Sequence, residues 1–228
     1  LTEQRYKEHK LKKMQYLGFC QQGKQVDYNP KLHAGVLLKF LPEEDGLTFH
    51  LNACFTDSLR QEMTGEHAVG KIRLERICGP VEQVDDTTFT VRFYRMGMYN
   101  PRRTSDIWLL ASHPGDKNYK GAVQQANLRI PYRLTEGKRQ HILFPGLEDV
   151  KAGSASLPLK AVSDCGLPVY YYVKEGPARI TENNTLEFTP IPPRSRFPVK
   201  VTVVAWQYGL KGKVQTAEPV ERSFYIYK

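Results

Sequence analysis

From Gly35 to the end of the chain, apolar and polar residues alternate in short runs separated by Gly, Pro, Asp and Asn. A period of two places successive side chains on opposite faces of an extended strand, and β-branched and aromatic residues are typical of strands. The expected strands lie at residues 36–41, 47–55, 71–77, 88–94, 106–111 and 126–132, and then at 141–144, 155–162, 167–173, 185–189, 200–206 and 221–227. Because no convincing helical pattern separates these runs, the sequence predicts antiparallel β-sandwiches.

The second half of the sequence is a degraded copy of the first half. Three blocks align in the same order, namely residues 49–58 with 157–166, 77–91 with 174–188, and 106–132 with 200–227. The middle block carries a Gly-Pro pair in both copies, at Gly79 and at Gly176. A repeat of about 100 residues is too long for a solenoid, so each copy is expected to form a domain of its own.

Apolar positions agree between the aligned strands, which indicates that the two copies have equivalent core faces. The agreement is seen where Ile107, Leu109 and Ala111 align with Val201, Val203 and Ala205. The copies differ mainly by an insertion in the first one, at roughly residues 56–70. Because this insertion is polar and contains glycine, it is expected to be an exposed loop.

The start of the chain differs from the rest. Residues 1–34 are expected to form a basic helical leader and a linker, because apolar residues recur there at near-helical spacing among many lysines. The two sandwiches are then expected at residues 35–133 and 140–228, joined by a short polar segment at 130–140. Since the chain begins with Leu rather than Met, we expect a processed form or a piece of a longer polypeptide.

The charge of the chain is basic, with a formal net charge of +9 and a pI near 9.3. Such a charge favours anionic partners such as nucleic acid, acidic polysaccharide or a phosphate-bearing surface. The basic residues are nevertheless scattered among 24 acidic residues, and no block of five or more like charges occurs. Nucleic-acid binding is therefore not expected. No membrane span is expected either, because no run approaches the roughly 18–20 apolar residues that a span needs.

The four cysteines, Cys20, Cys54, Cys78 and Cys165, show neither a CxxC motif nor metal-ligand spacing. None of them recurs at the aligned position of the other copy, which excludes a disulfide shared by both copies. A bridge between Cys54 and Cys78 stays open beside the alternative of unpaired thiols. We expect neither a metal site nor a cofactor.

Combinations of residues that could support catalysis or calcium binding are explained more simply by turns. Ser112 and His113 precede Asp116, but adjacent side chains of an extended segment point in opposite directions, and the intervening Pro-Gly is typical of a turn. Asp85, Asp86 and Asp116 could offer oxygen ligands to calcium, but the aligned positions of the second copy do not repeat the set. We therefore predict no catalytic residues and no enzymatic activity.

Two groups of residues remain as candidates for ligand binding. In the first group, arginines lie beside tyrosines in the connection at 92–103, where guanidinium groups suit carboxylates or phosphates and tyrosine rings suit a sugar. In the second group, two tyrosines lie on one face of a strand near a tryptophan, where they could form a glycan platform or pack on a neighbouring domain. Ion pairing within the connection and packing of the aromatic rings stay open as alternatives. The candidates are Arg92, Tyr94, Arg95, Tyr99, Arg102, Arg103, Tyr170, Tyr172 and Trp206.

In the second copy, Gly-Leu-Pro-Val opens one expected strand, a later strand ends in alanine, and Ala-x-Pro-Val precedes the last strand. The residues concerned are Gly166, Leu167, Pro168, Val169, Ala205, Ala217, Pro219 and Val220. With this pattern, about residues 140–228 resemble the Ig-like modules of secreted and cell-surface proteins of bacteria. The first copy shares this resemblance only through the repeat, and the proline- and arginine-rich segment at 189–200 departs from the short Gly-Thr turn of these modules. The resemblance implies modules placed beside catalytic, adhesive or glycan-binding domains, often in the polysaccharide-degrading systems of gut bacteria.

Together, the repeat and the resemblance predict an all-β fold of two tandem Ig-like antiparallel β-sandwiches behind a short helical and linker segment. The predicted function is that of a non-catalytic spacer, scaffold or accessory unit of a larger secreted, periplasmic or cell-surface bacterial protein. The alternatives are a carbohydrate-binding accessory module and the C-terminal part of a polysaccharide-degrading enzyme. The expected partners are neighbouring domains of a longer polypeptide, with polysaccharide as a further candidate. Any specific activity is expected where the copies differ, in the insertion after Phe55 and in the loop around Tyr99.

Overall fold

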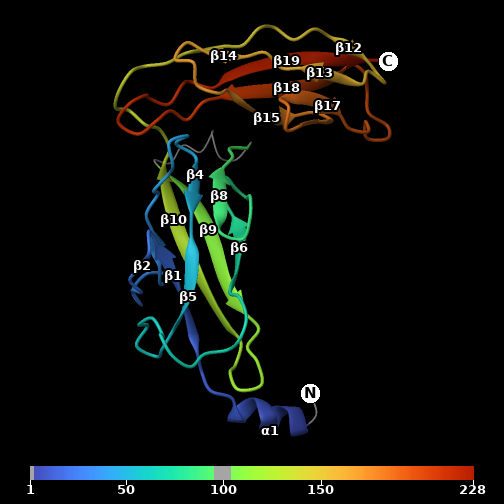
Figure 1. The fold of residues 1–228 in the computed structure, drawn as a ribbon. Helices are drawn as coiled ribbons and strands as arrows, with labels where there is room; N and C mark the ends of the chain where they lie inside the picture. The colour runs from blue at the N-terminus through green and yellow to red at the C-terminus, as the bar shows by residue number, and fades with distance from the viewer. Residues whose placement is uncertain (1–2, 95–103) are drawn as a thin grey trace. The chain divides into compact units, whose positions relative to one another are not determined.

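The computed structural model describes residues 3–94 and 104–228 (Figure 1). The chain forms two compact units, of which the first contains residues 3–92 and 104–130 of the described part. The second unit contains residues 131–228 together with Phe93 and Tyr94. Within the described residues, no helix has both the length and the apolar character needed to cross a membrane.

The regular elements in the described part of the first unit are strands, apart from one short helix. It contains helix α1 (Glu3–Leu11) and strands β1 (Tyr16–Gln21), β2 (Lys24–Gln25), β3 (Leu37–Leu38), β4 (Thr48–His50), β5 (Asn52–Thr56), β6 (Arg73–Cys78), β7 (Val81–Gln83), β8 (Thr88–Val91), β9 (Thr104–His113) and β10 (Ala122–Pro131). Its sheets have the strand orders β3-β10-β9-β6, β4-β8-β7 and β2-β1-β5. Strand β3 runs parallel to β10, whereas β6 pairs antiparallel with β9 and β8 pairs antiparallel with both β4 and β7.

The second unit repeats this arrangement. It contains strands β11 (Ile142–Leu143), β12 (Val150–Lys151), β13 (Ser156–Pro158), β14 (Val162–Ser163), β15 (Tyr170–Glu175), β16 (Ala178–Ile180), β17 (Thr185–Phe188), β18 (Val199–Trp206) and β19 (Val220–Tyr227). Its sheets have the orders β12-β19-β18-β15, β13-β17-β16 and β11-β14. Strand β12 runs parallel to β19, as β3 does to β10.

The registers of the strands confirm the alignment of the two halves. Phe49 pairs with Phe89 in the first unit, and Leu157 pairs with Leu186 in the second, which are the positions that the sequence aligns. The prediction of an all-β fold with two tandem Ig-like sandwiches is confirmed. The pairing is not fully antiparallel, as was expected, because a short strand near the start of each unit, β3 or β12, runs parallel to the last strand. Each unit also contains an isolated parallel bridge, described below.

The shared Gly-Pro pair has a structural reason in both units. Gly79 and Gly176 have φ values of +105° and +103°, which L-residues with a side chain rarely adopt. A Cβ on Gly79 would lie 2.5 Å from the backbone oxygen of Asp106, and one on Gly176 would lie 2.7 Å from that of Lys200. Each glycine therefore allows a strand to turn directly beside the backbone of its neighbour.

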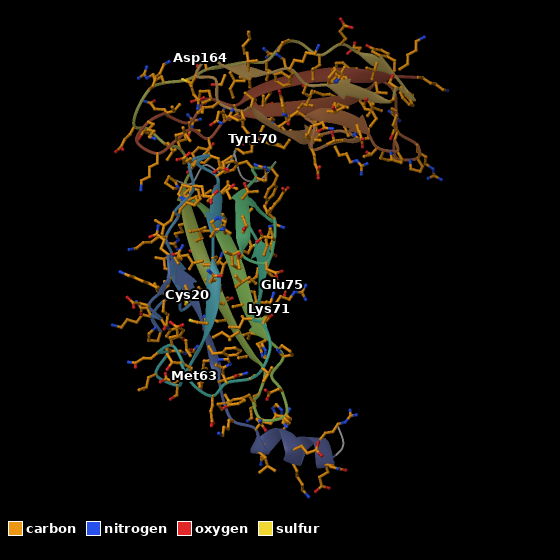
Figure 2. All side chains as sticks on the ribbon, viewed as in Figure 1. Cys20, Met63, Lys71, Glu75, Asp164 and Tyr170 are labelled. Atoms are coloured by element: carbon orange, nitrogen blue, oxygen red, sulfur yellow. The ribbon has the colours of Figure 1, made fainter. Side chains whose placement is uncertain are left out.

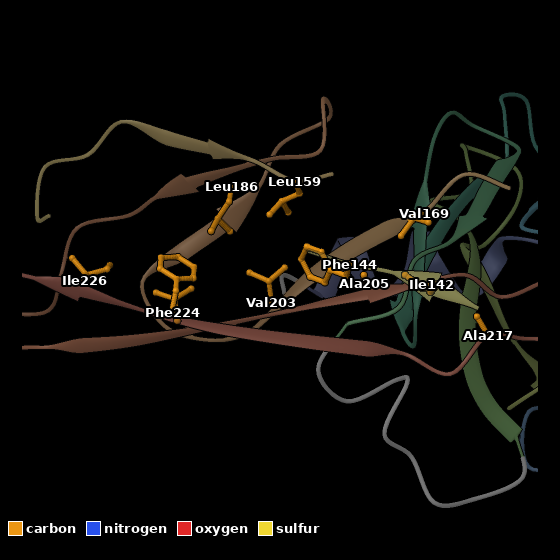
Figure 3. Close-up of a cluster of buried hydrophobic side chains, with 11 residues drawn as sticks. Ile142, Phe144, Leu159, Val169, Leu186, Val203, Ala205, Ala217, Phe224 and Ile226 are labelled. Carbon is orange, nitrogen blue, oxygen red and sulfur yellow. The ribbon is translucent and has the colours of Figure 1, made fainter. Parts of the chain in front are cut away.

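The core of the second unit lies between its sheets, as Figure 3 shows. Leu186 of β17 meets Val203 of β18 and Phe224 of β19 in one cluster of buried side chains. The remaining members of this cluster are Ile142, Phe144, Leu159, Val169, Val201, Ala205, Ala217 and Ile226. Full burial of an aliphatic or aromatic side chain contributes about 1.5–3 kcal/mol, so the second unit has a hydrophobic core of its own that stabilises it.

The structure differs from the expectation of a helical leader and linker over residues 1–34. Helix α1 does lie in this range, and an ion pair of 2.9 Å between Glu3 and Lys7 joins successive turns of this exposed helix. Strand β1, however, belongs to the first sandwich, because Leu17 pairs with Phe55 of β5 and both Leu17 and Phe19 are buried. The first sandwich thus starts well before Gly35.

The strand that opens each sandwich carries the same pattern of residues. Lys13 bridges in parallel to Tyr119, and Lys138 bridges in parallel to Val214. The buried Gln15 and Gln140 both donate a side-chain hydrogen bond to a backbone oxygen of the segment on the other side of that bridge. The pattern Lys-x-Gln-x-Leu/Ile-x-Phe is formed by Lys13, Gln15, Leu17 and Phe19 in the first unit and by Lys138, Gln140, Ile142 and Phe144 in the second.

The segment expected to join the two sandwiches is part of the second unit over most of its length. The backbone N–H of Lys138 donates to Lys213, and that of Thr216 donates to Leu134. The hydroxyl of the buried Tyr208 donates to the backbone oxygen of Pro131 over 2.6 Å. These hydrogen bonds attach residues 131–140 to the hairpin that follows β18.

Candidate functional site

The arginine and tyrosine connection is described only in part, because Arg95, Tyr99, Arg102 and Arg103 lie outside the described residues. Arg92 is half-buried at the end of β8, and its backbone N–H donates to Pro80. Its Nε lies 3.8 Å from an oxygen of Glu82, a long ion pair at the surface. The side chain of Tyr94 is exposed. The role of this connection in ligand binding stays a prediction.

The aromatic candidates of the second unit gather in a cluster, but most of their surface is covered. Tyr170 stacks on Trp206 with ring centroids 4.9 Å apart, and Phe93 meets Trp206 edge-on at 5.0 Å. Trp206 is fully buried and Tyr172 nearly so, while Tyr170 is half-buried. Of the two alternatives for these rings, a glycan platform or packing, the burial of Trp206 and Tyr172 fits packing, because Phe93 covers the tryptophan. The rings of Trp206 and Tyr172 offer no open face to a sugar.

His113 and Asp116 hold a turn. His113 is buried, and its Nδ1 accepts a hydrogen bond of 3.0 Å from the backbone N–H of Gly115. In the second unit, the side-chain oxygen of Gln207 accepts the corresponding hydrogen bond from Gly209. Since a glutamine performs the same task at the equivalent place, the histidine acts in the turn as an acceptor.

Two of the three aspartates considered as calcium ligands, Asp85 and Asp116, accept backbone hydrogen bonds, whereas the exposed Asp86 lies 3.9 Å from Nζ of Lys71. The carboxylate of Asp116 accepts from the backbone N–H groups of Val69, Asn118 and Tyr119, and these bonds hold its pKa below the usual range. Asp85 accepts in the same way within the hairpin between β7 and β8, and its pKa is also lowered by backbone hydrogen bonds. Both carboxylates therefore stabilise turns, as the sequence analysis favoured.

The insertion after Phe55 is anchored to the start of the first sandwich. The guanidinium group of Arg60 lies between the rings of Tyr16 and Tyr28, 4.5 and 4.2 Å from their centroids. Arg60 also donates to the side chain of Gln124, and its backbone oxygen accepts from Gln25. The insertion thus has a fixed point on the first sandwich, although its tip is exposed.

Two thiols meet beneath this insertion. Cys20 of β1 and Cys54 of β5 are diagonal neighbours, because Gly18 lies directly opposite Cys54 and Asn52 lies directly opposite Cys20. Their Sγ atoms are 3.0 Å apart, and Figure 2 labels Cys20 on its strand. A carboxylate oxygen of Glu62, from the insertion, lies within 4.8 Å of both sulfur atoms.

Gly18 leaves the space in which the thiols meet. A Cβ at this position would lie 2.9 Å from the methyl carbon of Thr56 and 3.4 Å from Sγ of Cys54. The side chains of Cys20 and Cys54, and a Cβ added to Gly18, point to the face of the strands opposite to Leu17, which is buried in the core. The thiol pair is therefore on the outer face of this sheet, under the insertion.

The two thiols differ in their ionisation. The hydrogen bond from Cys54 lowers the pKa of Cys20, because a donor stabilises the thiolate. The same hydrogen bond, together with burial, raises the pKa of Cys54. Cys20 is half-buried and Cys54 is buried. Cys20 is thus the more reactive thiol of the pair.

The remaining cysteines lie elsewhere. Cys78 is exposed at the end of β6, and the thiol of Cys165 lies 3.6 Å from the backbone oxygen of Arg139 in the second unit. All four cysteines are unbridged. Sequence reasoning considered Cys54 with Cys78 and missed Cys20, because Cys20 was assigned to the leader. The alternating run at 15–19 is the signal that could have placed it on a strand.

Two thiolates and a carboxylate are donors that zinc accepts, and they form the group in the described residues that could hold a metal. Two sulfur atoms on one tetrahedral zinc ion lie about 3.8 Å apart, given Zn–S bonds of about 2.3 Å. The observed separation of 3.0 Å is shorter. The geometry is therefore closer to a dithiol ready to form a disulfide than to a zinc site.

A groove of about 480 Å³ lies beside the thiol pair. Cys54 and Phe55 of β5 line it together with Met63 and His67 of the insertion and Lys71. Met63 and Lys71 are labelled in Figure 2. The imidazole ring of His67 stacks on Phe55 at 4.2 Å, which closes one side of the groove. Through this groove small solutes can approach Cys54.

No protein-family model and no curated protein matches this sequence. Among solved structures, the chain is similar to protocadherin gammaB7 EC3-6 (12% identity, TM-score 0.29, covering 94% of this chain and 51% of that one). It is similar to mouse cadherin-23 EC22-24 (13% identity, TM-score 0.29, covering 92% of this chain and 66% of that one). It is also similar to human protocadherin-24 EC1-2 (12% identity, TM-score 0.30, covering 85% of this chain and 94% of that one). The chain thus spans about half of the first of these structures, and similarity at this level assigns no function.

Proposed function

We propose that this chain is a pair of non-catalytic Ig-like modules that act as a load-bearing spacer or scaffold within a longer secreted or cell-surface polypeptide. The observation that carries this proposal is the duplicated sandwich, in which the same strand order recurs and a short early strand, β3 or β12, pairs in parallel with the last strand. What the two units share is the scaffold itself, while their loops differ.

The parallel pairing has a mechanical consequence. In the second unit β12 lies near the start and β19 at the end, and Val150 and Lys151 pair with Ile226 and Tyr227. When the two ends of a unit are pulled apart, parallel strands slide past one another, so their hydrogen bonds are loaded together and not one after another. The pairing of Asn127 and Leu128 of β10 with β3 has the same geometry in the first unit. This arrangement suits a module that transmits force along a chain.

The bacterial origin and the location outside the cytoplasm belong to this proposal and rest on the resemblance of residues 140–228 to modules of that kind. The expected partners are the neighbouring domains of the same polypeptide. A polysaccharide is a secondary partner, supported by the exposed side chain of Tyr94 and by the arginines that accompany it in the sequence of the connection.

Single-molecule force spectroscopy tests the proposed function. The 228-residue chain is stretched between handles at its termini. Two separate unfolding events are expected, each releasing on the order of 35 nm for roughly 100 residues at up to ~3.6 Å each. As a matched control, a handle at the exposed Arg196, just before β18, replaces the N-terminal handle, so that the adjacent open ends of β18 and β19 are pulled apart and the pair unzips one hydrogen bond after another. The control should yield at clearly lower force. Equal forces in both geometries would refute the load-bearing role.

Affinity electrophoresis separates this proposal from the carbohydrate-binding alternative. The chain is run in gels that contain neutral or acidic polysaccharides, beside the variants Tyr94→Ala and Arg103→Ala. A spacer should migrate alike in all gels. Retardation by one polysaccharide that is lost in both variants would instead establish a carbohydrate-binding module.

A further inference from the structure

We propose that Cys20 and Cys54 are the site of an intramolecular disulfide that cross-links β1 to β5 in an oxidising environment. The proposal goes beyond the spacer function and does not depend on it. It is carried by the separation of 3.0 Å between the two Sγ atoms, which exceeds a disulfide bond of about 2.05 Å by about 1 Å.

The positions on the sheet permit such a bond. The two cysteines lie on adjacent antiparallel strands and on the same face, as diagonal neighbours. Diagonal side chains are farther apart than directly opposite ones, but Gly18 removes the side chain that would stand opposite Cys54. Rotation of both thiols and a small shift of the two strands can close the remaining gap.

The exposures and acidities of the two thiols define an order of steps. The half-buried Cys20 thiolate attacks one sulfur of oxidised glutathione, forms a mixed disulfide and releases one glutathione thiolate. Cys54 then loses its proton to solvent, and its thiolate attacks Sγ of Cys20 and releases the second glutathione. Two protein thiols are oxidised and one glutathione disulfide is reduced to two glutathione molecules, so electrons and atoms balance.

The cross-link would secure the strand that opens the first sandwich. Strand β1 lies between β2 and β5, and the bond would join it covalently to β5. The aligned position of Cys54 in the second copy is Val162, so the second unit has no counterpart of this bond. The bond closes the loop from residue 20 to residue 54 and so lowers the conformational entropy of the unfolded chain. If this is its whole effect, it shifts the folding equilibrium of the first unit toward the folded state by on the order of a few hundredfold.

Peptide mapping tests the site in the wild-type chain. The protein is equilibrated at a series of ratios of oxidised to reduced glutathione, remaining thiols are alkylated in denaturant, and a non-reducing tryptic digest is analysed by mass spectrometry. The expected product is a cross-linked pair of peptides 14–24 and 40–60, which contain Cys20 and Cys54. Peptides 77–92 and 161–174, with Cys78 and Cys165, should be recovered in alkylated form.

The double variant Cys78→Ser/Cys165→Ser is the matched control and should still lose two alkylatable thiols on oxidation. Adding Cys20→Ser or Cys54→Ser to it should abolish the loss. The urea midpoint of the double variant should fall on addition of reductant, whereas that of the triple variants should not change. Because the cross-linked peptides are sought in the wild type, the test holds even if a triple variant does not fold.

Three results would overturn the proposal. The first is four alkylated thiols at the most oxidising ratio. The second is a cross-link that contains Cys78 or Cys165. The third is protection of Cys20 and Cys54 from alkylation by added Zn²⁺ without any cross-link in oxidised glutathione, which would assign a metal site with Glu62 as a further ligand.

Discussion

Replacing Gly176 with alanine tests the close approach of two strands on which both sandwiches depend. The residue has a φ of +103°, a conformation in which alanine is strained. The added Cβ would lie 2.7 Å from the backbone oxygen of Lys200 and 2.8 Å from Cα of Val201. Both atoms belong to the backbone of β18, which pairs with strands on both sides and cannot move away.

The magnitude follows from two separable contributions. A residue held in a sparsely populated backbone conformation costs about 1–3 kcal/mol. Forcing an extra methyl group into filled space costs about 1–3 kcal/mol more, and the upper part of that range applies where the neighbour is backbone. We therefore expect Gly176→Ala to lower the free energy of unfolding of the second unit by about 3–6 kcal/mol. That is a large part of the roughly 5–15 kcal/mol that stabilises a domain.

Two other glycines of the same unit provide matched controls. Gly153 has a φ of +92° but no atom within 4 Å of an added Cβ, so Gly153→Ala should cost only the backbone contribution of about 1–3 kcal/mol. Gly146 has neither a positive φ nor a neighbour within 4 Å. Gly146→Ala should therefore leave stability unchanged or raise it by up to about 1 kcal/mol.

Urea unfolding measured by tryptophan fluorescence provides the assay. In a Trp108→Phe background, Trp206 is the remaining tryptophan, so the signal reports on the second unit alone. The unfolding curves of the three alanine variants and of their common background are fitted with one shared m-value, the slope of the free energy of unfolding against urea concentration. Differences in the urea midpoint are then proportional to differences in stability. The reasoning fails if Gly176→Ala costs no more than Gly153→Ala, because the strand approach would then contribute nothing.

Three further predictions concern other contacts. Arg60→Lys keeps the charge but loses the planar guanidinium group that lies between two tyrosine rings, so it should destabilise the insertion by about 0.5–2 kcal/mol. Hydrogen exchange of the backbone amides at 57–63 should become faster, and an unchanged exchange rate would contradict the contact. Tyr208→Phe removes the hydrogen bond to Pro131 and should cost the second unit about 1–3 kcal/mol in urea unfolding, and a neutral effect would refute it. Arg133 lowers the pKa of Glu218 from its usual 4.5 through their hydrogen bond, so the pair stabilises above about pH 4.5 and this contribution is lost as the pH falls through the lower folded-state pKa. The difference in urea midpoint between wild type and Glu218→Gln should be small, because solvent screens this exposed pair, and it should disappear as the pH falls from about 6 to about 2.5. A difference that grows on acidification would contradict the lowered pKa of Glu218.

The internal repeat could be recognised in the sequence at positions where the backbone geometry allows only one type of residue. Gly79 and Gly176 recur because a side chain would collide with the neighbouring strand. The opening strand β1 escaped prediction, although Leu17 and Phe19 correspond to Ile142 and Phe144. The apolar residues before it recur at near-helical spacing, and the stretch between the opening strand and β4 is longer in the first copy than its counterpart in the second. The alignment therefore did not reach β1.

At the candidate binding sites, the sequence pattern did not predict which side chains are exposed. Alternation correctly places Tyr170 and Tyr172 on the face opposite to Tyr171, which packs against the core. Alternation says nothing about what covers that outer face, and Phe93, far away in the sequence, covers Trp206. A strand pattern defines two faces, but exposure depends on the chain segments that pack against them.

By itself, the sequence determined the strands, the two-domain repeat and the absence of a shared disulfide, because these follow from local alternation and from comparing one half with the other. The tertiary structure decided the partner of β1, the burial of Trp206 and the meeting of Cys20 with Cys54. Each of these depends on strand register and packing between residues far apart in the chain. A one-residue change of register would turn Cys20 toward the core and separate the thiols, and no local pattern in the sequence encodes that register.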